Sequence, residues 1–272
     1  MQSVMTLLLA HTDSYLREFD GVVTHVDHEA CALILDRTAF YPGGGGQPCD
    51  TGTIYWIDGN IRHEVGIIKA KKGGGDVSHY LTPTQTESDD AISFSSQDAG
   101  TVRSQPIIPL PTVGTTITGV IDWDRRYQLM RTHTAMHILC GVVWRDYGAQ
   151  VTGGNMQPLN GRMDFEFENL KRELVDEIEE KVNTEVLEAR EVRVAFLSHS
   201  DAEQIPDLIR TKINLVPNSI TKIRTVEIVG LDLQADGGTH VANTSEVGRL
   251  RVVDYKSKGR INKRIRIALE DS

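Results

Sequence analysis

The chain has few cysteines and no long hydrophobic run. Three cysteines, an odd number without paired spacing, predict no disulfide framework and favour a reducing compartment such as the cytoplasm. No segment approaches the ~20 apolar residues of a membrane span, and the N-terminus lacks the basic leading segment of a signal peptide. We therefore expect a soluble, cytoplasmic protein.

Positive charge is also in deficit, since 29 Lys and Arg residues face 38 Asp and Glu residues, for a formal net charge of −9. This balance excludes a protein that coats nucleic acid by its overall charge, so any RNA contact must come from a local basic patch. Hydrophobic residues make up 39% of the chain and charged residues 25%, as in ordinary globular proteins. A length of 272 residues allows one large domain or two modest ones, and we expect two.

The first part of the chain, residues 1–120, has the pattern of a small β-barrel or sandwich. Strand-like segments extend from Gly21 to Asp50, where they end in a Gly-rich turn, and a second strand pair follows from Gly52 to Ile68. Residues 81–111 are rich in Ser, Thr, Gln, Asp and Pro and show no sustained periodicity. Such a segment buries too little apolar area to offset the entropy of ordering, so we expect a flexible insertion there.

The second part, residues 121–272, reads as an α+β domain with long helices and a mixed or antiparallel sheet. Asp124 is placed to cap a helix that runs to about Tyr147, with Gly148 as its stop. A second helix begins after Asn169, because apolar residues then recur every four positions, and a capping box at residues 200–203 predicts a third. Alternation of basic and apolar residues over 264–269 predicts a strand.

Two short segments carry candidate metal ligands. His133 and His137 lie four residues apart within the first helix, so both imidazoles project from one face about one turn apart. Alone this pair is more often packing or surface than ligand, because a metal site needs further ligands. Downstream, Asp236 and His240 flank a Gly-Gly pair that allows a tight turn, which brings the two side chains together or leaves them facing water in a hairpin.

In the order and spacing of these segments and the Gly-rich stretch, the chain resembles the AlaX family. Members of this family are free-standing relatives of the editing domain of alanyl-tRNA synthetase. The matching stretches are residues 38–48 (TAFYPGGGGQP), 122–137 and 234–248. The resemblance implies a site for one zinc ion made by His133, His137, a cysteine and His240. Here Asp236 stands where the family usually has that cysteine. A carboxylate oxygen is an acceptable zinc ligand of the same formal charge, though a harder one.

Asp236 allows two interpretations. It either replaces the thiolate as a ligand, or it orients a catalytic water while three imidazoles hold the zinc. Cys49 and Cys140 are further sources of a thiolate, but Cys140 lies one turn beyond His137 and such a cysteine is more often simply buried.

The function implied by the resemblance is trans-editing, in which a hydrolase cleaves the ester of mischarged serine or glycine from alanine tRNA. Residues 121–272 would then be the zinc-binding editing domain, and no ATP-dependent synthetase core is visible, so no ATP is expected. No Ser-His-Asp arrangement of recognisable spacing points to a covalent mechanism. Thr38 and Gln47, which flank the Gly-rich stretch, are our candidates for recognising the serine hydroxyl; each is otherwise an ordinary strand or turn residue.

Basic residues crowd the C-terminal hairpin, where they predict a phosphate-binding patch for tRNA or, without the resemblance, a solvated strand face. They are Arg249, Arg251, Lys256, Lys258, Arg260, Lys263, Arg264 and Arg266, with Arg125, Arg126 and Arg131 on the first helix as a possible extension. Two other functions compete with editing: a zinc hydrolase of small esters, and a tRNA-binding module that lost hydrolysis through the Cys-to-Asp change at position 236. The sequence leaves the oligomeric state open.

Overall fold

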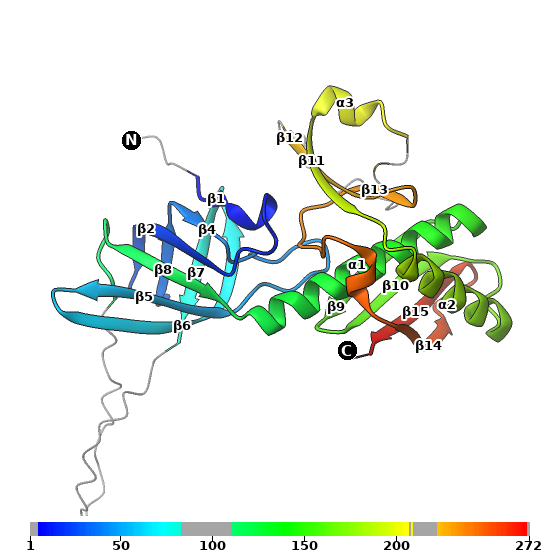
Figure 1. The fold of residues 1–272 in the computed structure, drawn as a ribbon, viewed down its shortest axis with the longest axis horizontal. Coiled ribbons are helices and arrows are strands. Elements are labelled where there is room, and N and C mark those ends of the chain that lie inside the picture. Colours follow the sequence, from blue (N-terminus) through cyan, green and yellow to red (C-terminus); the bar gives the residue numbers. More distant parts are fainter. Residues whose placement is uncertain (1–4, 83–109, 207, 209–221, 271–272) are drawn as a thin grey trace, which may run out of the picture.

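A computed structural model describes residues 5–82, 110–206, 208 and 222–270 (Figure 1). Most of the predicted insertion at 81–111 therefore lies outside the described residues. No helix in the described part of the chain combines the length and apolar character needed to cross a membrane.

A closed antiparallel barrel forms the left half of the molecule in Figure 1. Alternating apolar residues point inward, and Ile54, Val65 and Ile117 are almost completely buried. The barrel confirms the strand predictions for this part of the chain. In their order around the barrel, its strands are β2 (Glu18–Asp27), β3 (Ala32–Leu35), β7 (Asp76–Leu81), β6 (Ile61–Gly73), β5 (Gly52–Asp58) and β8 (Thr116–Ile121). Beside it, β1 (Leu7–Leu8) pairs in parallel with β4 (Arg37–Thr38), and η1 (Leu9–His11) follows β1.

The long helix α1 (Trp123–Tyr147) leaves the end of β8 and runs through the centre of the other half of the molecule (Figure 1). Its predicted end is confirmed, since Gly148 adopts the left-handed conformation with φ of 62°. The predicted cap at Asp124 is wrong: Asp122 is extended and its carboxylate accepts the Arg125 N–H, which places Asp124 inside the first turn.

Two further sheets surround α1. A four-stranded antiparallel sheet packs against it together with α2 (Arg172–Leu187), and a three-stranded antiparallel sheet carries the short α3 (His199–Glu203) (Figure 1). These elements confirm the mixed α+β class. The first sheet has the order β14 (Leu250–Ser257), β15 (Asn262–Leu269), β10 (Asn160–Glu166), β9 (Val151–Gln157), and the second β11 (Val192–Ser198), β12 (Lys222–Ile228), β13 (Asp232–Ala235), with η2 (Thr244–Val247) after β13.

Two predicted helix starts are shifted. Helix α2 begins two residues later than expected, so Leu170 precedes it and packs against the core from the connecting segment. The cap of α3 is Ser198, whose hydroxyl accepts the Asp201 N–H, and Ser200 lies within the helix. In both cases the backbone leading into the helix decides which residue has the extended conformation of a cap.

A buried ion pair joins the barrel to α1. The Arg126 guanidinium is fully buried and pairs with the Asp50 carboxylate, which follows the Gly-rich turn. Arg126 also donates to the main-chain oxygens of Ser14 and Ala39. All these acceptors are internal, so Arg126 has no surface left for a phosphate, contrary to its prediction as an RNA contact.

His79, on β7, is a second buried polar residue of the barrel. Its Nδ1 lies 3.2 Å from the Leu33 oxygen and its Nε2 lies 2.8 Å from the Thr38 hydroxyl. Burial lowers the pKa of His79 to about 4, although hydrogen bonds to the main chain oppose the shift. The imidazole is therefore neutral in the folded barrel at neutral pH.

We expect His79 to make the protein less stable in mild acid. As the pH falls through 6.5, His79 of the unfolded chain becomes protonated, whereas His79 of the folded barrel stays neutral until about pH 4. The free energy of unfolding therefore falls between these two pH values. Between pH 7 and pH 5 this contribution amounts to about 2 kcal/mol. Urea unfolding of the wild type and of His79→Gln measures it, because all other groups titrate equally in both. Equal losses of stability in the two proteins would contradict the assignment.

Candidate active site

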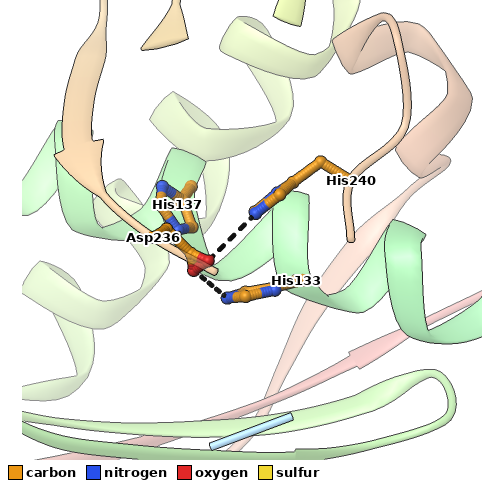
Figure 2. A group of neighbouring side chains, drawn as sticks. All are labelled: His133, His137, Asp236 and His240. Atoms are coloured by element: carbon orange, nitrogen blue, oxygen red, sulfur yellow. Dashed lines mark ion pairs between the residues drawn. The ribbon is translucent and has the colours of Figure 1, made fainter. Parts of the chain in front are cut away.

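His133 and His137 lie on the most buried section of α1. The helix is enclosed by sheets and loops, so residues 129–143 are all buried. Figure 2 shows both rings pointing from the helix toward the segment that follows β13. The i, i+4 spacing therefore places two imidazoles, 5.2 Å apart between ring centroids, inside the protein instead of on its surface.

The Gly-Gly turn brings Asp236 and His240 to the same point. The Asp236 carboxylate accepts the Gly238 N–H at 2.6 Å, which closes the turn on itself. A Cβ atom at Gly238 would lie 2.3 Å from Cε1 of His133 and 2.7 Å from Oε1 of Gln47, so only glycine fits here. The tight approach of this backbone to α1 seats the His240 ring at 4.2 Å from the ring of His133.

The four side chains form a donor set that suits one metal ion (Figure 2). From the Asp236 carboxylate oxygens, the Nε2 atoms lie at 3.3 Å (His133), 3.8 Å (His137) and 3.6 Å (His240). Ligand atoms around one tetrahedral zinc are separated by roughly 3.3 Å, since each lies about 2.0–2.1 Å from the ion. Nε2 of His240 is also buried without a hydrogen-bond partner among the described residues. Spacing, donor type and this unsatisfied nitrogen all fit a zinc ion.

The electrostatics of the cluster favour a cation. Burial lowers the pKa of His133 to about 4, and burial together with the His133 charge puts the pKa of His240 well below its usual value. Burial alone would raise the pKa of Asp236, but the surrounding imidazoles hold it well below its usual range. For His137, hydrogen bonds to Asp232 and Asp236 outweigh burial and raise the pKa to about 9. At neutral pH the Asp236 carboxylate is therefore ionised and His133 and His240 are neutral, as metal binding requires, whereas His137 holds a proton that a metal ion would displace.

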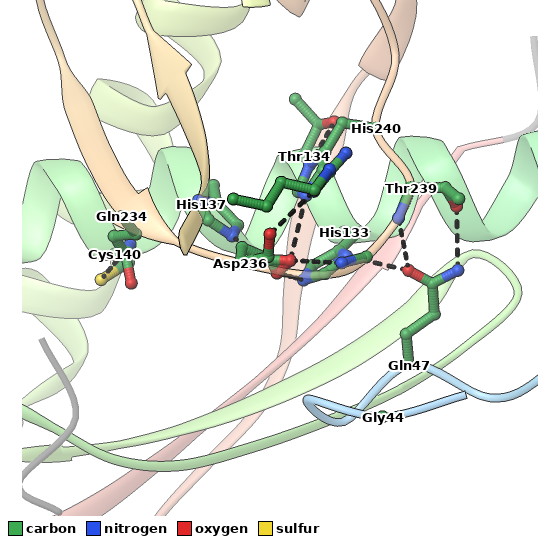
Figure 3. A network of polar contacts seen from close by, with 12 residues as sticks. Gly44, Gln47, His133, Thr134, His137, Cys140, Gln234, Asp236, Thr239 and His240 are labelled. Atoms are coloured by element: carbon green, nitrogen blue, oxygen red, sulfur yellow. Dashed lines mark hydrogen bonds and ion pairs between the residues drawn. The ribbon is translucent and has the colours of Figure 1, made fainter. Parts of the chain in front are cut away.

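Outer partners orient two of the imidazoles, and Figure 3 shows one of them, Gln47, beside His133. Oε1 of Gln47, from the Gly-rich turn, lies 2.9 Å from Nδ1 of His133 and also accepts the Thr239 N–H. The Asp232 carboxylate lies 3.0 Å from Nδ1 of His137 and accepts a hydrogen bond from Gln234. With both Nδ1 atoms engaged as donors, the Nε2 atoms present their lone pairs to the centre of the cluster.

Sequence reasoning missed Asp232. Its signal was an acid within an otherwise apolar strand segment, and the structure places its side chain inside the protein. Gln47 and Thr38, the two residues expected to recognise the serine hydroxyl, lie in different hydrogen-bond networks. Gln47 contacts the cluster, whereas the Thr38 hydroxyl bonds to His79 and to the Phe40 N–H within the barrel. None of these Thr38 contacts reaches the cluster.

The cysteines lie outside the four-residue donor set. Cys140 accepts a hydrogen bond from Gln234, and Cys49 is partly buried beside Arg125, whose side chain donates to the Cys49 oxygen. Among the described residues, Asp236 is the anionic member of the set.

The predicted RNA contacts separate into exposed and engaged side chains. Lys256, Lys258 and Arg260 are exposed at the tip of the hairpin between β14 and β15. Lys263 donates to two main-chain oxygens of the same hairpin, and Arg264 pairs with Asp164 through two bonds of 2.7 Å. Lys256, Lys258 and Arg260 define the exposed hairpin tip, and Arg249 and Arg266 of the predicted patch are exposed as well.

The sequence of this chain is similar to known proteins. Residues 223–266, which include nearly all of β12, all of β13 and the Gly-Gly turn, match the domain family described as the second additional domain of threonyl- and alanyl-tRNA synthetases. The alanine–tRNA ligase of Ignicoccus hospitalis is 34% identical over 92% of this chain, which corresponds to 24% of the ligase. The chain is thus similar to a class of domains found in aminoacyl-tRNA synthetases.

Free-standing relatives match over their whole length. The alanyl-tRNA editing protein AlaX-M of Methanosarcina acetivorans is 34% identical over 98% of this chain and 100% of its own. AlaX-M of Saccharolobus solfataricus is 35% identical over 96% of this chain and 98% of its own. The chain belongs to this family of alanyl-tRNA editing proteins, whose members are aminoacyl-tRNA deacylases.

Proposed function

We propose that this chain hydrolyses the ester bond between mischarged serine or glycine and alanine tRNA, in the cytoplasm, with one zinc ion held by His133, His137, Asp236 and His240. The convergence of these four side chains, with ligand atoms within 4.8 Å of one another, carries the proposal. Family membership supplies the tRNA substrate.

Zinc bound here would polarise the ester carbonyl and lower the pKa of a nearby water, which is sufficient chemistry for an activated ester. The chain's own residues prepare the site for it. Gln47 and Asp232 hold the rings of His133 and His137 in one tautomer and orientation. Asp236 contributes the negative charge that offsets a divalent cation.

The tRNA backbone would be bound through the exposed hairpin tip formed by Lys256, Lys258 and Arg260. Because the protein is acidic overall, only such a local cluster of cations can attract the phosphates of tRNA. We expect the affinity for tRNA to fall as the salt concentration rises, since each phosphate contact releases bound counter-ions. Arg125 supplements them from α1, where its side chain is partly buried.

Deacylation of seryl-, glycyl- and alanyl-tRNA, with the metal content of the same preparation determined, tests the proposal. We expect release of serine or glycine, sparing of alanine, about one zinc per chain and loss of both zinc and activity in His133→Ala. His199→Ala, a change at a partly exposed histidine of α3, is the matched control.

Two results would contradict the proposal. If the chain hydrolyses small serine esters at a rate that neither tRNA nor salt changes, it is a zinc hydrolase of small esters. Salt-sensitive tRNA binding without release of any amino acid would indicate a binding module that has lost hydrolysis.

A further inference from the structure

Arg224 is a buried cation beside the metal-ligand cluster. It lies on β12, with only 7% of the residue exposed. Its Nε donates to the His11 oxygen at 2.9 Å, and its Nη1 donates to the main-chain oxygen of Asp236 at 2.8 Å. The guanidinium therefore lies between η1 and the Gly-Gly turn that carries two of the proposed ligands.

The third nitrogen of this guanidinium is unsatisfied. Nη2 is buried and has no hydrogen-bond partner among the described residues. A charged donor left unpaired away from water is costly, so native proteins rarely keep one unless another molecule completes its bonding. Asp236 does not serve as its ion-pair partner within the described residues, because that carboxylate faces the three imidazoles.

The surroundings of Arg224 belong to the site. Burial lowers the pKa of His133 most, and the charge of Arg224 is a smaller cause in the same direction. Burial also lowers the pKa of Arg224 itself, and Asp236 and Tyr41 oppose that shift. Tyr41 belongs to the Gly-rich turn, which also carries Gln47 (Figure 3). The Tyr41 hydroxyl donates to the Gly44 oxygen within this turn. Among the described residues, no acceptor forms a hydrogen bond with Nη2.

We propose that Arg224 is a substrate-binding residue whose Nη2 donates a hydrogen bond to an oxygen atom of the aminoacyl-ribose end of the tRNA. This inference rests on the proposed function, which brings an ester carbonyl and ribose hydroxyls to the cluster. A guanidinium suits this task because it stays charged when buried and offers donors in a fixed plane. Nε and Nη1 hold that plane in place before the substrate arrives.

The test uses a non-hydrolysable probe, adenosine carrying serine through a 3′-amide, with binding measured by titration calorimetry. In Arg224→Lys we expect the affinity for this probe to fall by about 10- to 100-fold, as for a lost hydrogen bond to a charged group. We expect the affinity for zinc to stay within about 3-fold of the wild type, well below the loss seen when a ligand's outer partner is removed. Arg193→Lys, at an exposed arginine on neighbouring β11, is the matched control.

Rescue by added guanidinium ion distinguishes a residue that binds the substrate from one that only stabilises the site. In Arg224→Ala, added guanidinium ion should restore a measurable part of the probe affinity and of serine release, but lysine-sized ammonium ions should not. If probe and zinc affinities fall together and guanidinium restores neither, Arg224 only holds Asp236 in place and the inference is wrong. An unchanged probe affinity in Arg224→Lys would overturn it as well.

The same preparations distinguish this inference from the proposed function. A wild type that releases serine while Arg224→Ala releases it equally well counts against Arg224 alone. A wild type that releases neither serine nor glycine counts against the proposed function.

Discussion

Asp236→Ala is expected to lower the zinc affinity by more than ~100-fold and to abolish release of serine or glycine. Removal of an outer-shell partner alone typically costs about 10- to 100-fold in affinity, and Asp236 lies within 3.3–3.8 Å of three imidazole nitrogens. The variant also leaves those imidazoles without the one negative charge among the four side chains. Competition with a chromophoric zinc chelator measures the affinity.

Asp236→Cys gives the complementary result. A thiolate carries the same charge and is a softer donor that zinc prefers, so we expect zinc to bind at least as tightly as in the wild type. Asp58→Ala, a change at an exposed aspartate of β5, is the control. If Asp236→Ala kept its zinc and lost only activity, the carboxylate would orient water instead of binding metal.

Asp50→Ala is expected to destabilise the protein by about 3–5 kcal/mol, because it leaves a buried guanidinium without its counter-ion. Arg126 is fully buried, and Asp50 is the acid that pairs with it. The loss also loosens the Gly-rich turn, since the Asp50 carboxylate accepts the Tyr41 N–H at 2.6 Å. Urea unfolding at neutral pH measures the change in the free energy of unfolding.

Two comparisons make this prediction specific. The double variant Asp50→Leu with Arg126→Met removes both charges and should be less destabilised than Asp50→Ala, because no uncompensated charge stays buried. Glu64→Ala breaks an exposed pair with Arg62 and should cost within about 1 kcal/mol. Equal effects of Asp50→Ala and Glu64→Ala would contradict the role given to the buried pair.

Local patterns in the sequence were sufficient for much of the fold. The i, i+4 spacing of His133 and His137 placed both rings on one helix face, and Gly148 ended that helix as expected because only a residue tolerant of positive φ fits there. The strands of the barrel and of the C-terminal hairpin follow the alternation of apolar residues, as the buried Ile265 and Ile267 illustrate. These features depend on neighbours within a few residues, which the sequence contains.

Contacts between distant segments were beyond local patterns. Nothing near Arg126 in the sequence indicates that its partner is Asp50, so its charge suggested RNA when its place is inside the protein. Thr38 and Gln47 lie on opposite sides of one Gly-rich stretch, yet the hydroxyl of Thr38 bonds to His79 and the amide of Gln47 bonds to His133. No sequence pattern marked Arg224 and Asp232 as candidate site residues, because they come close to the histidines only when β12 and β13 pack beside α1.

The amino-acid sequence specifies which side chains are available for chemistry: two histidines one helical turn apart, and an aspartate and a histidine around a Gly-Gly pair. That these four side chains meet at one buried point follows from the packing of the whole chain. The reason is physical, because local spacing follows from backbone geometry, while burial, desolvation and long-range pairing depend on which surfaces the folded chain brings together. The same packing pairs Arg126 with Asp50 and buries Nη2 of Arg224 without an acceptor in the part of the chain that the structure describes.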